Sequence, residues 1–116
     1  MWWTVYIRPI PKKLLIHSIE YEEFKEDGSF GEEFHPIETI TNVLVQPRTE
    51  IRRDYNNEEV EIQAVIFLDA VNTPIFKPLR EKSKVHFNGR VWRVVSCEHL
   101  FTFDSSTPHH FEVGIK

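Results

Sequence analysis

The feature that most constrains the fold is the dipeptide Asn88-Gly89, which lies between two runs of β-forming residues within residues 84–97. Asn-Gly in this setting is the strongest short-range signal for a β-hairpin, because a two-residue type I′ turn needs positive φ angles at both central positions. A turn of this length also fixes the pairing of the strands, and it places Val85 opposite Trp92. The sequence therefore predicts a hairpin of defined register at this point.

Side-chain alternation then divides the predicted hairpin into two faces. One face is apolar and consists of Val85, Phe87, Trp92 and Val94. The opposite face is mixed in polarity. We expect the apolar face to belong to the core, with Trp92 largely buried as its aromatic anchor.

Period-two patterns of apolar residues recur along most of the remaining chain. They predict strands over residues 12–24, 30–37, 38–46, 60–68 and 109–116, separated by turns or loops at 25–29, 69–74 and 98–108. The later part of 60–68 is apolar on both faces, which is typical of a central strand. About six or seven short strands indicate an all-β fold, a small antiparallel β-barrel or sandwich.

Residues 48–59 form the most polar internal segment. Pro47 is expected to end the preceding strand, because proline cannot continue a central ladder. Thr49 is suited to cap a short helix near residues 49–56. A mobile loop is the alternative, and a connection of this length in a compact domain is usually functional or disordered.

Residues 1–11 are expected to form an N-terminal arm, in front of a single domain over 12–116. Two prolines keep the arm extended. Three aromatic side chains give it a large apolar load: Trp2, Trp3 and Tyr6. These side chains either fold back onto the domain or dock on a neighbouring subunit, since aromatic residues dominate interface anchors.

Composition limits the function classes. A chain of 116 residues with 41% hydrophobic residues makes one ordinary domain, and its net charge of −4 argues against duplex DNA as a primary ligand. One cysteine excludes an internal disulfide and favours a reducing compartment. The N-terminus lacks the pattern of a signal peptide, and no run is long enough for a membrane helix, so we expect a soluble protein made in the cytoplasm.

Residues able to perform catalysis or bind metal are present but lack the required spacing. The six histidines are scattered, and His109 and His110 point to opposite faces of a predicted strand. Cys97 and His99 have no cysteine-protease signature around them. We therefore expect no enzyme activity, no metal and no cofactor.

Two basic groups remain, and each is either a solvated surface or a transient contact for phosphates. The first lies in the polar segment and consists of Arg48, Arg52 and Arg53. The second precedes the hairpin and consists of Lys77, Arg80, Lys82 and Lys84.

Taken in order, these segments resemble the minor capsid and head-closure (stopper) proteins of long-tailed phages and prophages of Gram-positive bacteria. The matching stretches are Lys12–His17 running to Tyr21–Phe24, Val45-Gln46-Pro47 with the polar segment after it, Phe67–Thr73, Ser83–Val94 and His109–Val113. The resemblance covers most of the chain from Lys12 onward. The arm before Lys12 is not part of it.

The resemblance implies a small β-barrel in the connector between capsid and tail, located in the virion and in the host cytoplasm during assembly. Such proteins form a homo-oligomeric ring under the portal and adaptor proteins, and we expect this chain to be monomeric or weakly associated when free. There they retain packaged DNA, touching it transiently and without sequence preference, and they offer a docking surface to tail proteins. No membrane is involved.

In related head-closure proteins, the loop after the Val-Gln-Pro strand projects toward the central channel. Here that loop corresponds to residues 48–59, and its channel or gating residues are Arg48, Arg52, Arg53, Asp54 and Tyr55. One alternative is a tail-side joining or completion protein of similar fold, since fold does not fix function. A small barrel that binds a peptide or single-stranded nucleic acid through exposed aromatic residues is a second alternative, of a different class.

Overall fold

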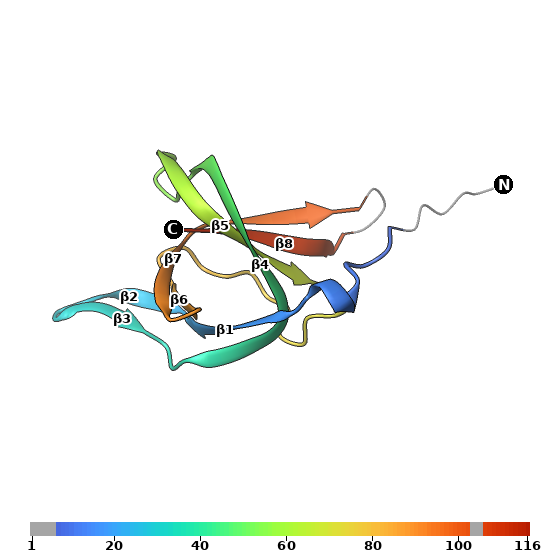
Figure 1. The fold of residues 1–116 in the computed structure, drawn as a ribbon. Helices are drawn as coiled ribbons and strands as arrows, with labels where there is room; N and C mark the ends of the chain where they lie inside the picture. Colours follow the sequence, from blue (N-terminus) through green and yellow to red (C-terminus); the bar gives the residue numbers. More distant parts are fainter. Residues whose placement is uncertain (1–6, 103–105) are drawn as a thin grey trace.

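The computed structural model describes residues 7–102 and 106–116 of the chain (Figure 1). The described residues form the 3-10 turn η1 (Lys12–Leu14) and the strands β1 (His17–Glu22), β2 (Phe24–Gly28), β3 (Gly31–Phe34), β4 (Glu38–Arg53), β5 (Glu59–Asp69), β6 (Lys84–Phe87), β7 (Arg90–Phe101) and β8 (Pro108–Ile115). The predicted all-β fold is confirmed. No α-helix is present in the described part of the chain, so the predicted helix near residues 49–56 is wrong.

The strands of the main sheet form a closed antiparallel barrel in the order β1-β4-β5-β8-β7-β6, completed by pairing of β1 with β6. Strands β2 and β3 form a separate two-stranded sheet that extends away from the barrel (Figure 1). Strand β5 lies between β4 and β8, which agrees with its apolar character on both faces. Among the two architectures left open by the sequence, the chain adopts the barrel.

The hairpin at Asn88-Gly89 has the predicted turn and register. Asn88 and Gly89 have φ angles of 54° and 74°, and Val85 pairs with Trp92 across β6 and β7. Both residues thus adopt the left-handed conformation that a type I′ turn requires.

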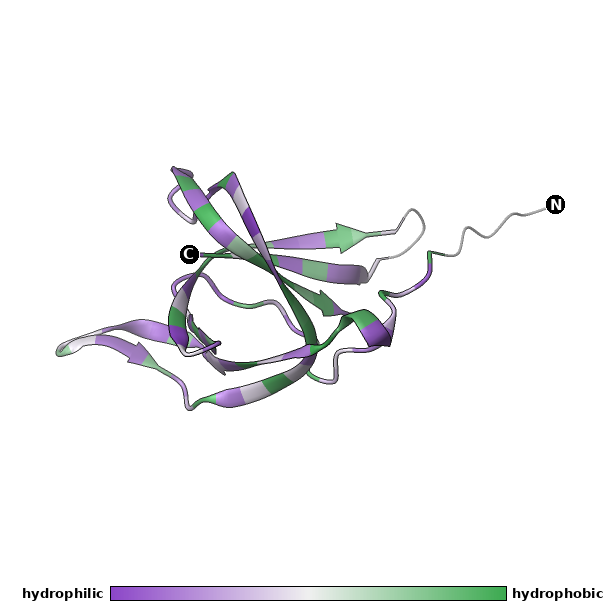
Figure 2. Cartoon of the chain, viewed as in Figure 1, coloured by the Kyte–Doolittle hydropathy of each residue, from purple (hydrophilic) through white to green (hydrophobic). Residues whose placement is uncertain are grey.

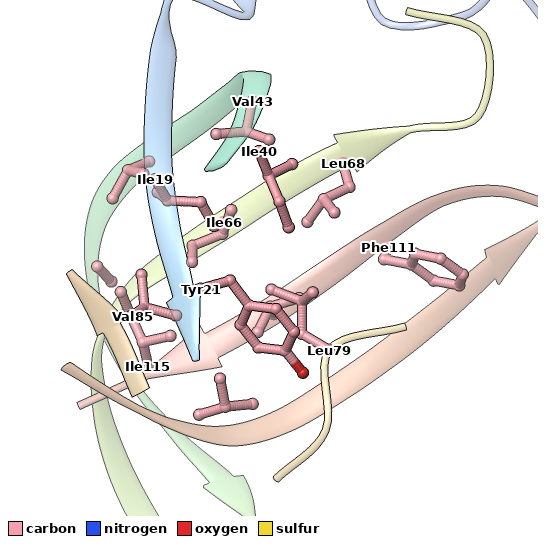
Figure 3. Packing of buried hydrophobic residues seen from close by; sticks show 14 residues of the cluster. Ile19, Tyr21, Ile40, Val43, Ile66, Leu68, Leu79, Val85, Phe111 and Ile115 are labelled. Atoms are coloured by element: carbon pink, nitrogen blue, oxygen red, sulfur yellow. The ribbon is translucent and has the colours of Figure 1, made fainter. Parts of the chain in front are cut away.

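The barrel interior is filled by inward-facing aliphatic side chains around Tyr21 (Figure 3). Val85 and Val94 are buried there, as expected from the hairpin register. Phe87 and Trp92 pack against this core but are only partly buried. Trp92 donates its indole N–H to the carbonyl of Phe87 at 3.4 Å, and the guanidinium of Arg90 lies 3.9 Å from its ring centre. Trp92 thus packs at the edge of the core, next to the exposed turn, and is less completely buried than Val85 and Val94.

Tyr21 brings a hydroxyl into this apolar interior, and the hydroxyl is satisfied by the connector before β6. It accepts a hydrogen bond from the backbone N–H of Arg80 at 2.8 Å and lies 3.2 Å from the hydroxyl of Ser83. Burial raises the pKa of Tyr21, so the phenol stays protonated. Ser83 in turn accepts from the backbone N–H of Phe24 at 2.9 Å, which fixes the point where β2 leaves the barrel.

A bulge in β4 changes the face expected for part of this strand. Simple alternation over 38–46 places Ile40 and Val43 on opposite faces, yet both are buried in the core. The pairing shifts between His17–Val43 and Ile19–Ile40, so β4 carries one extra residue relative to β1. Asn42 lies in the bulge with a φ angle of 55°.

Three other predicted boundaries differ from the structure. The strand expected over 12–24 is divided into η1, β1 and β2, because the chain leaves the barrel after Glu22 to pair with β3. The strand expected over 30–37 is shortened to β3. Residues 98–101, expected in a loop, continue β7 because they pair with the first half of β8.

Pro47 does not end its strand, and β4 continues to Arg53. Pro47 pairs with Ala64 of β5, whereas the pairing of β4 with β1 ends at Val43. This part of β4 is therefore an edge, where a missing backbone donor is tolerated. A register shift between Pro47 and Glu50 marks a second bulge, beyond which the strand pairs again with β5.

Candidate assembly surfaces

The second half of β4, the first half of β5 and the turn between them form one projecting unit, here called the distal hairpin (residues 48–62). Asp54 organises its turn: its carboxylate accepts hydrogen bonds from the backbone N–H groups of Asn56 and Glu58 at 2.9 and 3.0 Å. The backbone of Asp54 also pairs with that of Glu58. The segment predicted as a loop is thus a hairpin with a short ordered turn.

The distal hairpin packs against the neighbouring strands through a small apolar cluster of its own. Ile62 is fully buried together with Val65 and Val95, outside the main core. A Cβ atom on Gly114 would lie 3.1 Å from a methyl carbon of Ile62. Glycine at this position of β8 therefore allows the close approach of the hairpin.

Arg52 is the centre of an ion-pair network at this contact. Its side chain is only 9% exposed. The guanidinium contacts Glu50 of the same strand, Glu98 of β7 at 2.9 Å and Glu112 of β8 at 3.7 Å. A buried cation is costly unless it is paired, so these carboxylates are required for the arginine to lie here. The reading of Arg52 as part of a solvated surface is wrong.

The same network continues along the start of β8. Arg48 lies 3.9 Å from Glu112 and 5.7 Å from the ring centre of Phe67. His110 lies 3.1 Å from Glu112, and its other ring nitrogen lies 2.8 Å from His109. The two histidines therefore contact each other, although the sequence pattern separates them onto opposite faces.

The predicted channel residues are thus divided into two groups. Arg48 and Arg52 point toward β7 and β8 and belong to the network that holds the distal hairpin. Arg53 is in the last ladder pair, and Asp54 and Tyr55 lie in the turn beyond it. The side chains of Tyr55 and Ile51 are 55% and 58% exposed. The Arg53 guanidinium donates to the carbonyl of Asn57 at 2.8 Å and lies 3.4 Å from the carboxylate of Glu59.

The second projecting unit is the β2–β3 ribbon, here called the acidic hairpin (residues 24–34). Aromatic and cationic side chains hold its base: the rings of Phe24 and Phe34 meet edge to face at 5.9 Å, and Lys84 and Arg93 lie over Phe34. Arg93 also donates two hydrogen bonds to Glu32, at 2.8 and 3.1 Å. Hydrogen bonding from Arg93 lowers the pKa of Glu32, and the same contact raises the pKa of Arg93.

The tip of the acidic hairpin presents Phe30, whose side chain is fully exposed. The sequence pattern predicts a turn at residues 25–29 and does not single out Phe30. The sequence does contain a signal for this exposed aromatic residue, because Phe30 lies in the turn Gly28-Ser29-Phe30-Gly31. The pairing of β2 with β3 gives its side chain no neighbour to pack against.

The beginning of the described chain is fastened to the barrel by Asp69, which is buried. One carboxylate oxygen accepts from the backbone N–H of Ile10 at 2.9 Å, and the other accepts from Val71 and Asn72 at 3.0 and 2.9 Å. The Asn72 amide then donates to the carbonyl of Ile10 at 2.8 Å. The predicted arm residues Trp2, Trp3 and Tyr6 lie outside the described residues.

Across residues 7–102 and 106–116, no group of three or more His, Cys, Asp or Glu side chains is placed to hold a metal ion. The helices of the described chain include none with the length and apolarity needed to cross a membrane. Burial raises the pKa of the Cys97 thiol, which lowers its thiolate fraction.

The described chain is thus a small closed barrel with one braced hairpin and one hairpin that ends in an exposed aromatic side chain. A model of the minor capsid protein family matches residues 11–115, and the chain belongs to that family. Its role is accordingly structural, in a virus particle. Comparison with curated proteins and with solved structures gave no match.

Proposed function

We propose that the protein is a component of the head–tail connector of a long-tailed phage, where it closes the DNA-filled capsid and offers a docking surface to the tail. In this proposal the free protein is monomeric or weakly associated, and it forms a ring on the portal and adaptor proteins. The observation that best supports the proposal is the distal hairpin, which combines a rigidly held base with an exposed tip. A ring of such hairpins can narrow a channel without any catalytic chemistry.

The tip of the distal hairpin, residues 54–58, is the segment that we assign to the channel axis. It lies beyond the last ladder pair, Arg53 with Glu59, and its fold depends on Asp54 and a few backbone hydrogen bonds. Segments with few buried contacts rearrange at low free-energy cost. Opening then needs a change in the tip while the Arg52 network keeps the base in place.

The charges of the distal hairpin suit a channel that lets DNA pass. Its arginines are near carboxylates: Arg48 lies beside Glu112, Arg52 lies in the network, and Arg53 lies beside Glu59. Strong binding to DNA requires free cationic side chains that neutralise phosphates and release the counterions bound to the DNA. Contacts with packaged DNA in this proposal are consequently weak and independent of sequence.

The N-terminal aromatic residues Trp2, Trp3 and Tyr6 are assigned in this proposal to contacts with the adaptor or a neighbouring subunit. A deletion of residues 1–6 is expected to leave the barrel folded and to weaken docking onto the portal–adaptor complex. Wild-type affinity of the deletion variant would remove the arm from the assembly role.

The closure role is tested by a phage or prophage that lacks this gene, with a second strain that lacks only the hairpin tip, replaced by a short Asn-Gly turn. We expect both to package DNA and then to lose it before tails attach, and we expect purified heads of the null strain to lack tails. Heads that stay full and stable without the protein would contradict the closure role. That outcome, combined with failure of isolated tails to join heads, would indicate a tail-side completion protein.

A further inference from the structure

The side chain of Phe30 is exposed to an extent that requires explanation. Its relative exposure is 105%, at the turn of a ribbon in which β2 and β3, within the described chain, pair only with each other. Figure 2 shows hydrophilic colours along most of this ribbon and hydrophobic colour at its tip. A single aromatic side chain at the end of a protruding element is the typical form of an interface anchor.

The acidic hairpin is held in a defined direction before any partner binds. Arg80 donates to the carbonyls of Phe24 and Lys25 at 2.9 and 3.1 Å, and Arg93 clamps Glu32 from β7. The backbone N–H of His35 donates to the carbonyl of Glu23 at 2.8 Å and closes the base. A pre-oriented element loses little conformational entropy on binding, which favours docking.

The charge of this hairpin defines the partner that it fits. Residues 24–34 carry a net charge of −3, from four carboxylates and Lys25. Asp27 lies 3.7 Å from Lys82, and Glu32 is bound by Arg93. Glu26 and Glu33 form no ion pair within the described part of the chain, so they remain available to cations of another molecule.

The opposite end of the same chain carries an apolar pocket, and a segment rich in cations adjoins it in the sequence. The pocket has a volume of about 280 Å³ and is lined by Ile7, Leu100, Phe101, Thr102, His109 and His110. A cavity of about 150 Å³ is enough to hold benzene. The adjoining residues 7–16 include three cations, Arg8, Lys12 and Lys13, and no carboxylate, which gives them a net charge of +3.

The two complementary features cannot meet within one molecule. Figure 1 places the tip of β2–β3 at one end and the adjoining ends of β7 and β8 at the other. Contact between them therefore requires two copies in head-to-tail order. A head-to-tail contact repeats from copy to copy and generates a ring when the rotation closes.

We propose that the acidic hairpin of one copy inserts Phe30 into the apolar pocket at the ends of β7 and β8 of the next copy, with Glu26 and Glu33 near the cations of residues 7–16. The partner is thus a second copy of this chain. This inference rests on the ring of the proposed function, and it is independent of the closure role and of the distal hairpin.

Photo-cross-linking of the purified full-length chain tests the contact directly. Position 30 receives p-benzoylphenylalanine, and the protein is irradiated at concentrations up to about 1 mM, which half-populates even a millimolar complex. We expect a cross-linked dimer whose second peptide lies in residues 7–14 or 100–110. Cross-links to other regions, cross-links within one chain, or no dimer at the highest concentration would each overturn the proposal.

Sedimentation equilibrium of matched variants tests the energetics. Phe30→Ala is expected to weaken self-association about thirtyfold, as truncation of an interface anchor does. The control Val91→Ala removes another exposed apolar side chain, which is 53% exposed at the start of β7 and lies outside both the acidic hairpin and the pocket lining, and it should leave association unchanged. Equal association of Phe30→Ala and wild type would overturn the proposal.

A charge exchange adds a test that misfolding cannot imitate. Glu33→Lys and Lys13→Glu should each weaken association, and an equimolar mixture of the two single variants should recover much of it, because both kinds of contact between unlike copies pair opposite charges. The double variant should recover most of it, because opposite charges face each other again in every contact. Lack of recovery, with unchanged thermal unfolding of each variant, would contradict the assigned orientation. If heads that lack the protein stay full, the closure role fails. The self-association expected in these three tests does not depend on that role.

Discussion

The two hairpins that project from the barrel differ in how they are held. The distal hairpin has a buried cluster around Ile62 and a nearly buried arginine between carboxylates of three strands. The acidic hairpin is fixed at its base and ends in an exposed side chain. The same supersecondary element therefore serves as a braced part of the barrel in one place and as an extended arm in the other.

The two hairpins are held differently because they contact different parts of the barrel. Beyond its second bulge, β4 pairs again with β5, and the hairpin lies against β7 and β8, where Gly114 leaves room for it. Strands β2 and β3 leave the barrel and meet no third strand among the described residues. A two-stranded ribbon alone is marginally stable, so its order depends on the contacts at its base.

The largest effect is expected from Arg52→Ala. The substitution leaves the carboxylate of Glu98 without its cation and leaves Glu112 with Arg48 alone, at 3.9 Å. Breaking a buried ion pair costs about 3–5 kcal/mol. Because Glu98 is 49% exposed, we expect the lower end of this range, measured by urea unfolding. The control is Arg53→Ala, at a side chain 58% exposed, which should cost less than about 1 kcal/mol. Equal costs for both variants would show that the distal hairpin is not braced.

A smaller effect is expected from Gly114→Ala. The added methyl group meets Ile62 at 3.1 Å and the hydroxyl of Ser96 at 3.0 Å, so the distal hairpin must move outward. Overpacking of this kind costs about 1–3 kcal/mol. Amide exchange should show the loss concentrated in residues 59–62, with residues 24–34 unaffected. Uniform loss over both hairpins would mean that they are coupled.

Acidification is expected to loosen the acidic hairpin. The folded-state pKa of Glu32 lies below its ordinary value of 4.5, so its contribution is fully present above pH 4.5 and is lost as the pH falls through the lower folded-state value. The two-dimensional NMR spectrum should show shifts at residues 24–34 over that range, and Glu32→Gln should abolish the shifts that follow Glu32. Persistence of the full titration in Glu32→Gln would assign the effect to another carboxylate.

The smallest effect is expected from Phe30→Ser. Because the side chain is fully exposed in the isolated chain, its replacement should change the free energy of unfolding by less than about 0.5 kcal/mol. Thermal and urea unfolding measure this directly. A clear loss of stability would show that Phe30 supports the fold, and its assignment as an interface anchor would then fail.

Sequence reasoning succeeded where local chemistry decides the structure. The positive φ angles of Asn88-Gly89 fixed the register of β6 and β7, and the apolar pattern of 60–68 identified the central strand. Sequence reasoning failed where the pairing with a neighbouring strand decides the structure. Pro47 stays in β4 because that stretch is an edge of the sheet. A bulge at Asn42 changes which side chains of β4 face the core.

The same distinction applies to the candidate site. Arg48, Arg52 and Arg53 are equally polar in the sequence, and only the fold separates a buried network centre from an exposed tip. The carboxylates of Glu98 and Glu112 that hold Arg52 come from strands far along the chain, and no local pattern links them to it. The sequence analysis missed Phe30 because its exposure depends on the absence of packing partners around the turn. The alternation of apolar and polar residues predicts the faces of strands and gives no information on the exposure of a turn residue.

The pairing of β1 with β6 gives the barrel a seam. It consists of three residue pairs, Glu20–His86, Tyr21–Val85 and Glu22–Lys84, fewer than at any other junction of the barrel within the described chain. The His86 ring nitrogen lies 2.5 Å from the Glu22 carboxylate and spans this junction. Under heat or mechanical load the barrel is expected to open along this line first, before its longer junctions separate.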